Sequence, residues 1–307
     1  MSEIICQTIN LSKKYKGTAA LDQVNIQVRR GDIYGLIGEN GAGKSTLLKI
    51  IAGLSFASEG EIELLGKRHQ TGLAKSRGHI GCLIEAPALY GEMSAEQNLE
   101  VHRIQRGIPG KDCINEVLKL VKLDQTGSKR VKYFSLGMKQ RLGLAIALLG
   151  DPELLILDEP VNGLDPTGIE ELRNILIKLN KEKGTTIMIS SHILSELHKF
   201  VSCYGIIHGG KVMEQLTAEE LGRKCQKHIY LKVNDPKKAV CLLENSLGIK
   251  HYEVCPNQVI KIYEKLNQCF EINKELALNQ VYLEEITLKG DSLESYFSKV
   301  IGGSQHV

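Results

Sequence analysis

The sequence predicts an α/β fold whose core is a parallel sheet, followed by a small α+β domain. The first observation is a pair of apolar runs, ELLILDEP and TTIMISSH, each of which ends in polar residues. The second is the helix-like segment GIEELRNILIKLNKEKG between them, because strand, helix and strand in succession are typical of parallel α/β sheets. The third is a change of pattern near Gly222, from which strands and helices follow a βαββαβ order.

Short β-rich segments open the chain. They read EIICQTINL, LDQVNIQVRR, DIYGLIG and GEIELLG, and turns that contain Gly and Lys separate them, which favours an antiparallel or mixed sheet. Helical periodicity follows between Ser94 and Gly150 and predicts several helices. In KDCINEVLKLVKL, four apolar residues share one helix face: Ile114, Val117, Leu118 and Val121.

The last part of the chain has the pattern of a separate small domain. Its predicted elements are the strand HIYLKV, the helix PKKAVCLLENSL, the strands KHYEVC and QVIKIYE, the helix CFEINKELAL, the strand VYLEEITL and a closing helix, DSLESYFSKVI. This order fits a ferredoxin-like α+β domain. We therefore expect two domains, residues 1–221 and residues 222–307, and we interpret the second, which carries no chemical motif, as an accessory domain.

The composition is that of a globular protein, because 42% of the residues are hydrophobic and 24% are charged. The formal net charge is +3 and no long block of like charge occurs, so the sequence predicts no nucleic-acid partner. None of the eight cysteines stands in C-x-x-C spacing, and no apolar stretch approaches the roughly 20 residues of a membrane span. We expect a cytosolic protein with reduced thiols, to which another chain supplies any membrane span.

A Gly-rich segment lies between the apolar run DIYGLI and the helix-like TLLKIIAGL. It matches the pattern G-x-x-x-x-G-K-[ST] with Gly38, Glu39, Asn40, Gly41, Ala42, Gly43, Lys44 and Ser45. Backbone amides and the helix that starts near Gly43 can bind phosphate oxygens, Lys44 adds a cation, and Ser45 can place its hydroxyl on Mg²⁺. A purely structural turn is the alternative, but the flanking strand and helix favour the phosphate site.

Two adjacent carboxylates end the apolar run LLILDEP, at the edge where open α/β sheets bind ligands. Carboxylates at the end of a buried strand are costly unless a cation or a reaction uses them. Asp158 is suited to holding Mg²⁺ through its water shell, and Glu159 to orienting or deprotonating an attacking water molecule.

The segment FSLGMKQR at 134–141 narrows the class of protein. It resembles the LSGGQ-x-Q-R signature of ABC ATPases, with Phe134 in place of Leu, Leu136 in place of the first Gly and Met138 in place of Gln. A GTPase is not indicated, since the stretch nearest to N-K-x-D reads NKEK. The resemblance covers about residues 1–220. It implies an ABC-type P-loop NTPase cassette with a parallel α/β core, an antiparallel β subdomain and a helical subdomain.

This resemblance implies an ATP site shared by two cassettes. Tyr15 corresponds to the aromatic residue on which adenine stacks, and the helix N-terminus at Ser135 corresponds to the one that faces the partner's nucleotide. The D-loop corresponds to residues 162–165. The implied ATP-binding residues are Tyr15, Gly38, Glu39, Asn40, Gly41, Ala42, Gly43, Lys44, Ser45, Thr46, Ser135, Gly137 and Asp165. Singly, Ser135 and Asp165 could be helix caps, and Tyr15 a strand aromatic.

The catalytic and metal-binding residues are implied in the same way. His192 matches the switch histidine, which stabilises transition-state charge; singly, it could be a histidine at a strand end. Glu85, in IGCLIEAPALY, stands where the family usually has Gln and where the exporters that this chain resembles tend to have Glu; its alternative is a solvated charge. We expect Glu85 to sense the metal-bound nucleotide and to signal to a membrane partner through residues 86–90. The implied catalytic residues are Lys44, Glu85, Glu159 and His192, and the implied metal ligands are Ser45, Glu85 and Asp158.

A single cassette without coiled-coil heptads favours a transport subunit. The chain looks most like the ATPases of bacitracin and lantibiotic exporters, on the basis of FSLGMKQRL, IEAPALY and the compact C-terminal extension. This resemblance implies ATP-dependent pairing as a homodimer or with a second cassette, separate transmembrane permease subunits, and a cytoplasmic, peripheral position on the inner face of the membrane. Another drug, sodium or polysaccharide exporter is one alternative, and a soluble ABC ATPase with a regulatory role is the other.

Overall fold

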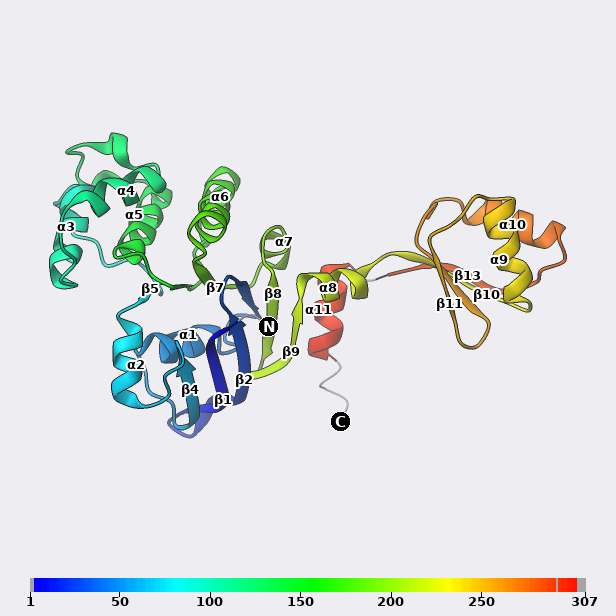
Figure 1. Ribbon diagram of the computed structural model, residues 1–307, viewed down its shortest axis with the longest axis horizontal. Helices are drawn as coiled ribbons and strands as arrows, with labels where there is room; N and C mark the ends of the chain where they lie inside the picture. Colours follow the sequence, from blue (N-terminus) through cyan, green and yellow to red (C-terminus); the bar gives the residue numbers. More distant parts are fainter. Residues whose placement is uncertain (1–2, 291, 303–307) are drawn as a thin grey trace. The chain divides into compact units, whose positions relative to one another are not determined.

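The structure is a computed structural model that describes residues 3–290 and 292–302. Contacts divide the chain into two compact units, Met1–Ala218 and Glu219–Val307, whose helices and strands are labelled in Figure 1. Each unit has its own hydrophobic core. The division falls a few residues before 221/222, at the start of helix α8 (Ala218–Cys225).

The first unit is built on a six-stranded sheet with the order β5-β6-β7-β3-β8-β9. Its strands are β5 (Ile80–Leu83), β6 (Leu154–Leu157), β7 (Thr186–Ser191), β3 (Ile33–Ile37), β8 (Cys203–His208) and β9 (Lys211–Thr217). Neighbouring strands are parallel except for β8 and β9. Every residue of β3, β6 and β7 is buried, which explains why their sequences are nearly continuous apolar runs. The predicted parallel pairing of the two core strands is confirmed.

A second, antiparallel sheet of three strands has the order β2-β1-β4, with β1 (Ile4–Tyr15), β2 (Thr18–Arg29) and β4 (Glu59–Leu64). Three of the four β-rich segments at the start of the chain form this sheet, as predicted. The fourth, DIYGLIG, does not belong to it and forms β3 in the parallel sheet. The reason is burial: β2 alternates between buried and exposed residues, whereas β3 is buried throughout and requires cover on both faces.

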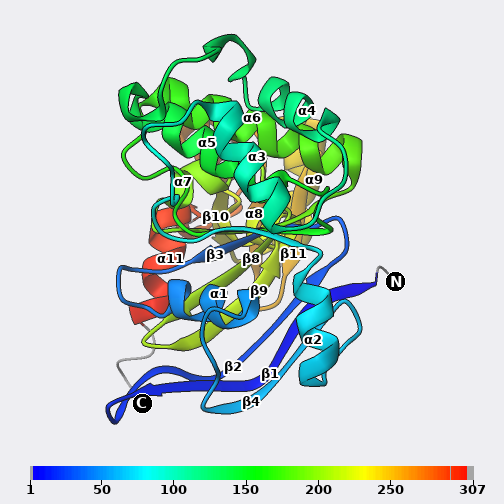
Figure 2. The same ribbon diagram turned by 90° about the vertical axis from the view of Figure 1, so that its left-hand side faces the viewer.

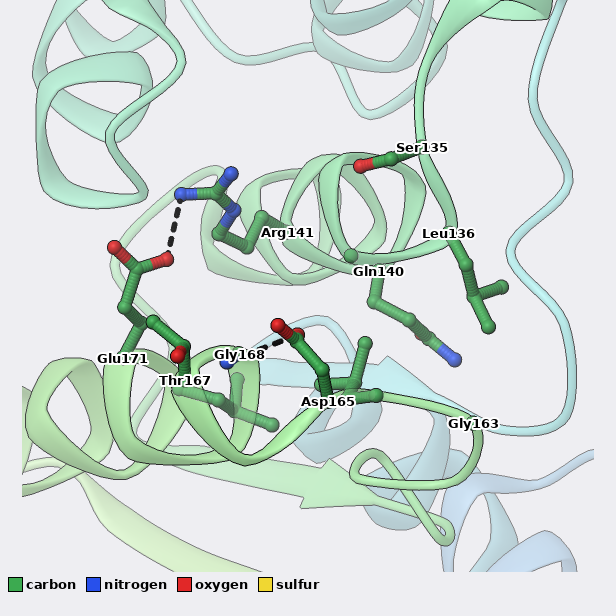
Figure 3. Close-up of a pocket in the computed structure, with 12 residues that line it drawn as sticks. Ser135, Leu136, Gln140, Arg141, Gly163, Asp165, Thr167, Gly168 and Glu171 are labelled. Carbon is green, nitrogen blue, oxygen red and sulfur yellow. Dashed lines mark hydrogen bonds and ion pairs between the residues drawn. The ribbon is translucent and has the colours of Figure 1, made fainter.

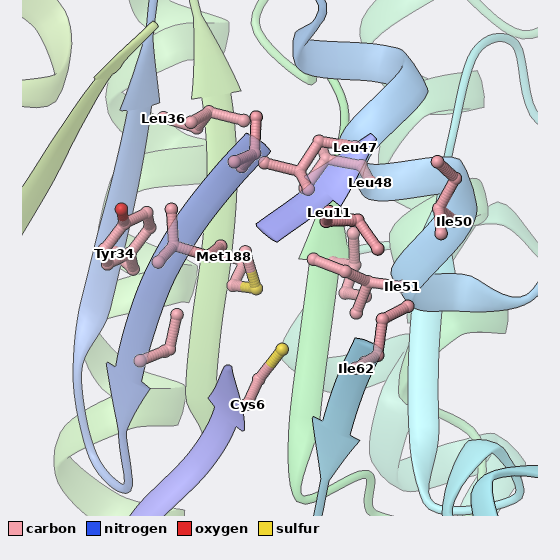
Figure 4. Packing of buried hydrophobic residues seen from close by; sticks show 14 of the residues in the cluster. Cys6, Leu11, Tyr34, Leu36, Leu47, Leu48, Ile50, Ile51, Ile62 and Met188 are labelled. Carbon is pink, nitrogen blue, oxygen red and sulfur yellow. The ribbon is translucent and has the colours of Figure 1, made fainter. Parts of the chain in front are cut away.

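The core of the first unit lies between these sheets and contains helix α1 (Lys44–Ala52). Figure 4 shows side chains of this cluster, including Leu47 of α1, Leu11 of β1 and Met188 of β7. Because α1 begins at Lys44 and packs its apolar face into this core, the loop before it is held firmly against the sheet edge. Helix α2 (Gln70–Arg77) adds Leu73 to the same cluster.

A helical segment follows β5 and comprises α3 (Ala95–Gln105), α4 (Asp112–Leu120) and α5 (Leu136–Leu148), with short 3-10 turns at Asp124–Thr126 and Val131–Tyr133. Figures 1 and 2 show α3, α4 and α5 on the side of the first unit opposite the three-stranded sheet. The four residues predicted to share one face are all buried. Helices α6 (Pro166–Lys183) and α7 (Leu194–Leu197) complete the unit. Within the described residues, every helix is too short or too polar to cross a membrane.

The second unit has the predicted ferredoxin-like order. It contains β10 (His228–Val233), α9 (Pro236–Asn245), β11 (Tyr252–Cys255), β12 (Val259–Ile262), α10 (Cys269–Leu278), β13 (Leu283–Lys289) and α11 (Leu293–Gly302). The four strands form an antiparallel sheet with the order β11-β12-β10-β13. Alternate residues of β10, such as Leu231, pack on α9 and α10 to form the core. Asp291, where the closing helix was predicted to begin, lies outside the described residues.

Candidate functional site

The phosphate loop joins the carboxyl end of β3 to the N-terminus of α1. Gly43 precedes the helix with a φ of 109°, and a Cβ atom there would lie 2.7 Å from the Ala20 carbonyl oxygen. A Cβ atom on Gly38 would lie 2.4 Å from the Ile207 carbonyl oxygen. Both positions therefore require glycine, because the backbone of the loop runs against its neighbours. The loop residues Glu39, Asn40 and Gly41 are exposed, Ala42 is buried, and Ser45 and Thr46 follow Lys44 in the first turn of α1.

Lys44 is held inside this loop. Its side chain is only 5% exposed, and its ammonium group donates to the carbonyl oxygens of Gly38 at 2.7 Å and Glu39 at 3.0 Å. The same nitrogen lies 3.1 Å from Oε1 of Glu159. The cation that would bind phosphate is thus fixed at the loop and already next to the carboxylate predicted as the base.

The two carboxylates at the end of β6 are positioned by one serine. Ser190 Oγ donates to Asp158 Oδ1 at 2.6 Å and accepts a hydrogen bond from the Glu159 amide at 2.8 Å. Asp158 is buried. Sequence reasoning missed Ser190, although a signal exists: β6 and β7 are parallel with Leu157 opposite Ile189, so the next residue of each strand meets at the sheet edge.

His192 completes a chain of three side chains, because its Nδ1 lies 2.8 Å from Oε2 of Glu159. Glu159 is 16% exposed, and its backbone adopts a φ of 47°, in the left-handed region. Its Oε1 is buried and has no hydrogen-bond partner with good geometry, although the charge of Lys44 is close. An acceptor atom in this position is suited to receive a hydrogen bond from a water molecule, which is what a general base requires.

Glu85 lies near this group but does not contact it. It follows β5 with a φ of 64°, and the Leu83 carbonyl oxygen accepts a hydrogen bond from the Asp158 amide at 2.8 Å, which ties the two strand ends together. The exposed Glu85 carboxylate forms an ion pair with Lys49 of α1. This contact is the largest cause of the raised pKa of Lys49. Sequence reasoning did not identify Lys49 as a partner.

Ser135, Gly137 and Asp165 line a separate cavity of about 410 Å³ between the N-terminal ends of α5 and α6, shown in Figure 3. Ser135 Oγ accepts from the Met138 amide and Asp165 Oδ1 from the Gly168 amide, so both residues are helix N-caps. Leu136 also lines the cavity and lies against Gly163 of the D-loop segment. Lys44, Asp158 and Glu159 are not among the residues that line this cavity.

Tyr15 ends β1 and is 48% exposed. Its hydroxyl lies 3.5 Å from Ser55 Oγ, just after α1, and Lys13 Nζ lies 4.8 Å from the centre of its ring. An exposed aromatic ring close to the helix that carries Lys44 is available for stacking. Its exposure also fits a half-buried strand aromatic, so stacking on adenine stays a prediction.

A divalent cation fits this site only together with a nucleotide. Among the described residues, no three His, Cys, Asp or Glu side chains form a metal-binding cluster of their own. The donors at hand are the carboxylate of Asp158, fixed by Ser190, and the hydroxyl of Ser45. Mg²⁺ is commonly held by one or two such oxygens together with phosphate groups and water, so the donor set suits it. A glycine-rich loop with its lysine, facing carboxylates at the edge of a parallel sheet, defines the class of P-loop NTPases.

Comparison with known proteins gives the family. The ABC transporter family model matches residues 21–162. Bacitracin transport ATP-binding protein BcrA of Bacillus licheniformis is 44% identical over 303 residues, which are 99% of each chain. Lantibiotic transport ATP-binding protein SrtF of Streptococcus pyogenes is 46% identical over 204 residues, which are 66% of this chain and 87% of that protein. The chain belongs to the family of ABC transporter ATP-binding subunits, and it is an ABC ATPase that binds and hydrolyses ATP.

Solved structures agree with this assignment. The dimeric post-hydrolysis state of the ATP-binding cassette MJ0796, bound to ADP and Pi, is similar with a TM-score of 0.64 and 26% identity, over 69% of this chain and 98% of that chain. The protein cbiO1 from Clostridium perfringens, part of an ABC transporter complex, has a TM-score of 0.65 and 27% identity, over 80% of this chain and 97% of that chain. The predicted cassette fold is therefore confirmed.

Proposed function

We propose that this ATPase uses Glu159 as the base for the attacking water and couples hydrolysis to the export of an antimicrobial peptide such as bacitracin. The observation that carries the catalytic part is the position of the Glu159 carboxylate, which lies between Lys44 and His192. The substrate class rests on the relatives, which are named as bacitracin and lantibiotic transport proteins and which match this chain in sequence.

In the proposed mechanism, Lys44 exchanges its two backbone acceptors for phosphate oxygens of ATP. That exchange leaves Glu159 Oε1 to accept a proton from water, while His192 holds the other carboxylate oxygen. Ser45 and Asp158 would hold Mg²⁺, and Ser190 keeps Asp158 oriented. When bound, Mg²⁺ would supply positive charge that neutralises the phosphate oxygens. Every residue in this scheme acts by position and charge, which is what phosphoryl transfer requires.

We infer that two cassettes pair around ATP. Ser135 and Gly137 line a cavity apart from Lys44, so one chain does not gather the whole predicted ATP site by itself. Cassettes that pair head to tail would bring the Ser135 cavity of one copy to the nucleotide of the other, and a similar cassette is known as a dimer. In the copy that holds the nucleotide, Tyr15 would stack on adenine, while Asp165, which lines the Ser135 cavity, would contribute from the D-loop of the other copy.

The proposed role at the membrane involves separate permease subunits. The relatives that match this chain almost over its full length are described as transport ATP-binding proteins, which favours a transport role over the soluble regulator. We propose that the chain is cytoplasmic and attaches to the inner face of the membrane through its permease. Residues 222–307 are the proposed accessory domain.

Glu159→Gln tests the catalytic assignment. We expect ATP turnover to fall by about 100-fold or more, because the amide cannot accept the proton, while ATP binding persists and the ATP-bound dimer accumulates. Turnover, nucleotide binding and size-exclusion chromatography measure these results. Glu153→Gln is the matched control, since Glu153 precedes β6 and pairs with Arg30 away from the site. Undiminished turnover in Glu159→Gln would contradict the role of Glu159 as base.

Cell fractionation tests the transport assignment. When the chain is produced together with the membrane proteins encoded by its neighbouring genes, we expect it in the membrane fraction and in a complex that survives mild detergent. Production without those neighbours is the control, and there the chain should leave the membrane fraction. Recovery in the cytosol alone, with the neighbours present, counts against a transport subunit.

A further inference from the structure

Lys49 and Glu85 form an ion pair beside the ATP site that the catalytic scheme above does not use. Lys49 lies on α1, the same helix that begins with Lys44, and its ammonium group contacts Oε1 of Glu85. The side chain of Lys49 is 32% exposed and that of Glu85 is 67% exposed. The pair therefore links the phosphate-binding helix to the segment after β5 through a contact that is open to solvent.

The surroundings of Lys49 connect it to the nucleotide site on two sides. The hydrogen bond to Glu85 is the largest cause of the raised pKa of Lys49, and the negative charge of Asp158 adds to it. The Lys49 carbonyl oxygen accepts hydrogen bonds from the amides of Leu54 and Ser55, and Ser55 Oγ lies 3.5 Å from the Tyr15 hydroxyl. Lys49 is thus linked through Ser55 to the residue proposed for adenine, and its charge interacts with that of the carboxylate proposed for the metal.

We propose that Lys49 is the counter-ion that holds Glu85 while no metal-bound nucleotide is present, and that Glu85 leaves it when the nucleotide and Mg²⁺ bind. This proposal rests on the proposed ATPase function and on the metal-sensing role that the family resemblance implies for Glu85. A glutamine at position 85 could not form an ion pair with Lys49, so the holding contact depends on the carboxylate that this chain carries. Lys49 acts as a positioning residue and needs no contact with ATP.

The physical basis is that the Glu85 carboxylate is attracted more strongly to Mg²⁺ than to the ammonium group of Lys49. An ion pair this exposed is weak, because water screens both charges and two flexible side chains must be ordered. A doubly charged cation with oxygen ligands attracts a carboxylate more strongly than one ammonium group does. Without Lys49, Glu85 would add an uncompensated negative charge near the phosphate site, and this charge would repel phosphate groups that arrive without metal. With Lys49, the charge of Glu85 is neutralised until the nucleotide and Mg²⁺ bind.

The test compares the affinity of the full-length chain for ATP with and without Mg²⁺, measured by equilibrium binding of a fluorescent ATP analogue. Lys49→Gln should weaken metal-free binding and strengthen binding with Mg²⁺. The ratio of the two dissociation constants, metal-free over metal-bound, should rise by about two- to fivefold, the range expected for an exposed pair. Lys49→Arg keeps the pair and should leave the ratio close to that of the unchanged chain.

Glu85→Gln and the double variant decide the interpretation. We expect Glu85→Gln to lower the ratio, and Lys49→Gln to have no further effect on the ratio in that background. An equal rise in both backgrounds would overturn the proposal, because Lys49 would then act on the phosphates directly. No change in Lys49→Gln alone would overturn it as well. If Glu85→Gln itself leaves the ratio unchanged, the metal-sensing role of Glu85 is wrong, and that failure is distinct from failure of the pair.

Lys183→Gln is the matched control. Lys183 forms an equally close ion pair with Asp151, both side chains are exposed, and the pair belongs to the same unit. Loss of this pair should leave the ratio of dissociation constants unchanged. A similar rise in this control would mean that any lost surface pair alters the ratio, and would overturn the specific role of Lys49.

Discussion

At the scale of single residues, the hydroxyl of Ser190 positions both carboxylates of the proposed ATP site. It donates to Asp158 and receives the Glu159 amide, so it fixes the side chain of one residue and the backbone of the other. A partner of this kind orients a metal ligand without touching the metal, and its loss typically reduces metal affinity or activity by 10- to 100-fold.

Ser190→Ala should therefore reduce ATP turnover by about tenfold or more, measured at saturating ATP over a series of Mg²⁺ concentrations. Higher Mg²⁺ should restore part of the rate, because Asp158, the proposed metal ligand, is misoriented rather than removed. Ser191→Ala is the control: Ser191 is also buried, but its Oγ binds the backbone of Ile193 and does not reach either carboxylate. Equal rates in both variants would show that Ser190 does not orient the site.

Motifs in the sequence identified most residues of the candidate site. They did not identify the residues that position those side chains. Lys44, Glu159 and His192 were identified from motifs, and the structure places them in one contiguous group. Ser190 could have been predicted, because parallel neighbouring strands align their ends. Lys49 could not have been predicted as the partner of Glu85, because this contact depends on the distance between α1 and the end of β5, which no periodicity in the sequence encodes.

At the scale of elements, the N-termini of α5 and α6 have the same construction. A side-chain oxygen of Ser135 or Asp165 caps the helix, and both helix ends face the cavity in Figure 3. The structural alternative for these two residues is therefore confirmed as caps, while their contact with a partner's nucleotide stays a prediction. The two roles are compatible, because a capped N-terminus still presents free amides to an anion.

Ser135→Ala separates the two roles when it is compared with Ser94→Ala. Both serines cap a helix by accepting one amide, from Met138 and from Gln97 respectively, so each change should lower the free energy of unfolding by about 1 kcal/mol. Only Ser135→Ala should also impair ATP-dependent pairing and turnover. Chemical denaturation and turnover assays measure the two effects. Equal turnover in both variants would mean that Ser135 acts only as a helix N-cap.

The assignment of DIYGLIG to the first sheet failed for a reason that belongs to this scale. When only turn residues and spacing are considered, a short apolar strand cannot be distinguished from the half-buried strands that precede and follow it in the sequence. Its five consecutive buried residues, Ile33–Ile37, instead mark a central strand of a parallel sheet. Burial on both faces was visible in the sequence as the lack of alternation.

At the scale of the whole molecule, the chain has two separate cores. The order of elements in residues 222–307 could be predicted, because alternation and turn residues mark each strand and helix there. Its role could not, since no motif for chemistry occurs in that part. All the residues proposed for the ATP site lie in the first unit, so the two cores should respond independently to mutation.

Leu231→Ala should destabilise the second unit by about 2–5 kcal/mol, because Leu231 is fully buried in β10. Calorimetry should show one transition moving to a lower temperature, with ATP affinity unchanged. Leu278→Ala is the control, since Leu278 is 71% exposed and its removal should change stability by less than about 0.5 kcal/mol. Loss of ATP binding in Leu231→Ala would mean that the two units do not behave independently.

The left-handed backbone at Glu85 and Glu159 has a consequence for anyone who wishes to engineer this enzyme. A residue with a side chain pays about 1–2 kcal/mol for that conformation, and glycine adopts it without this cost. A selection for heat resistance alone will therefore favour glycine at the exposed Glu85 and collect variants whose proposed metal sensor is gone. At Glu159 the gain is outweighed, because the buried Lys44 would lose its charge partner. Variants at position 85 therefore have to be ranked by ATP turnover, because there a higher melting temperature indicates that the proposed function of Glu85 has been lost.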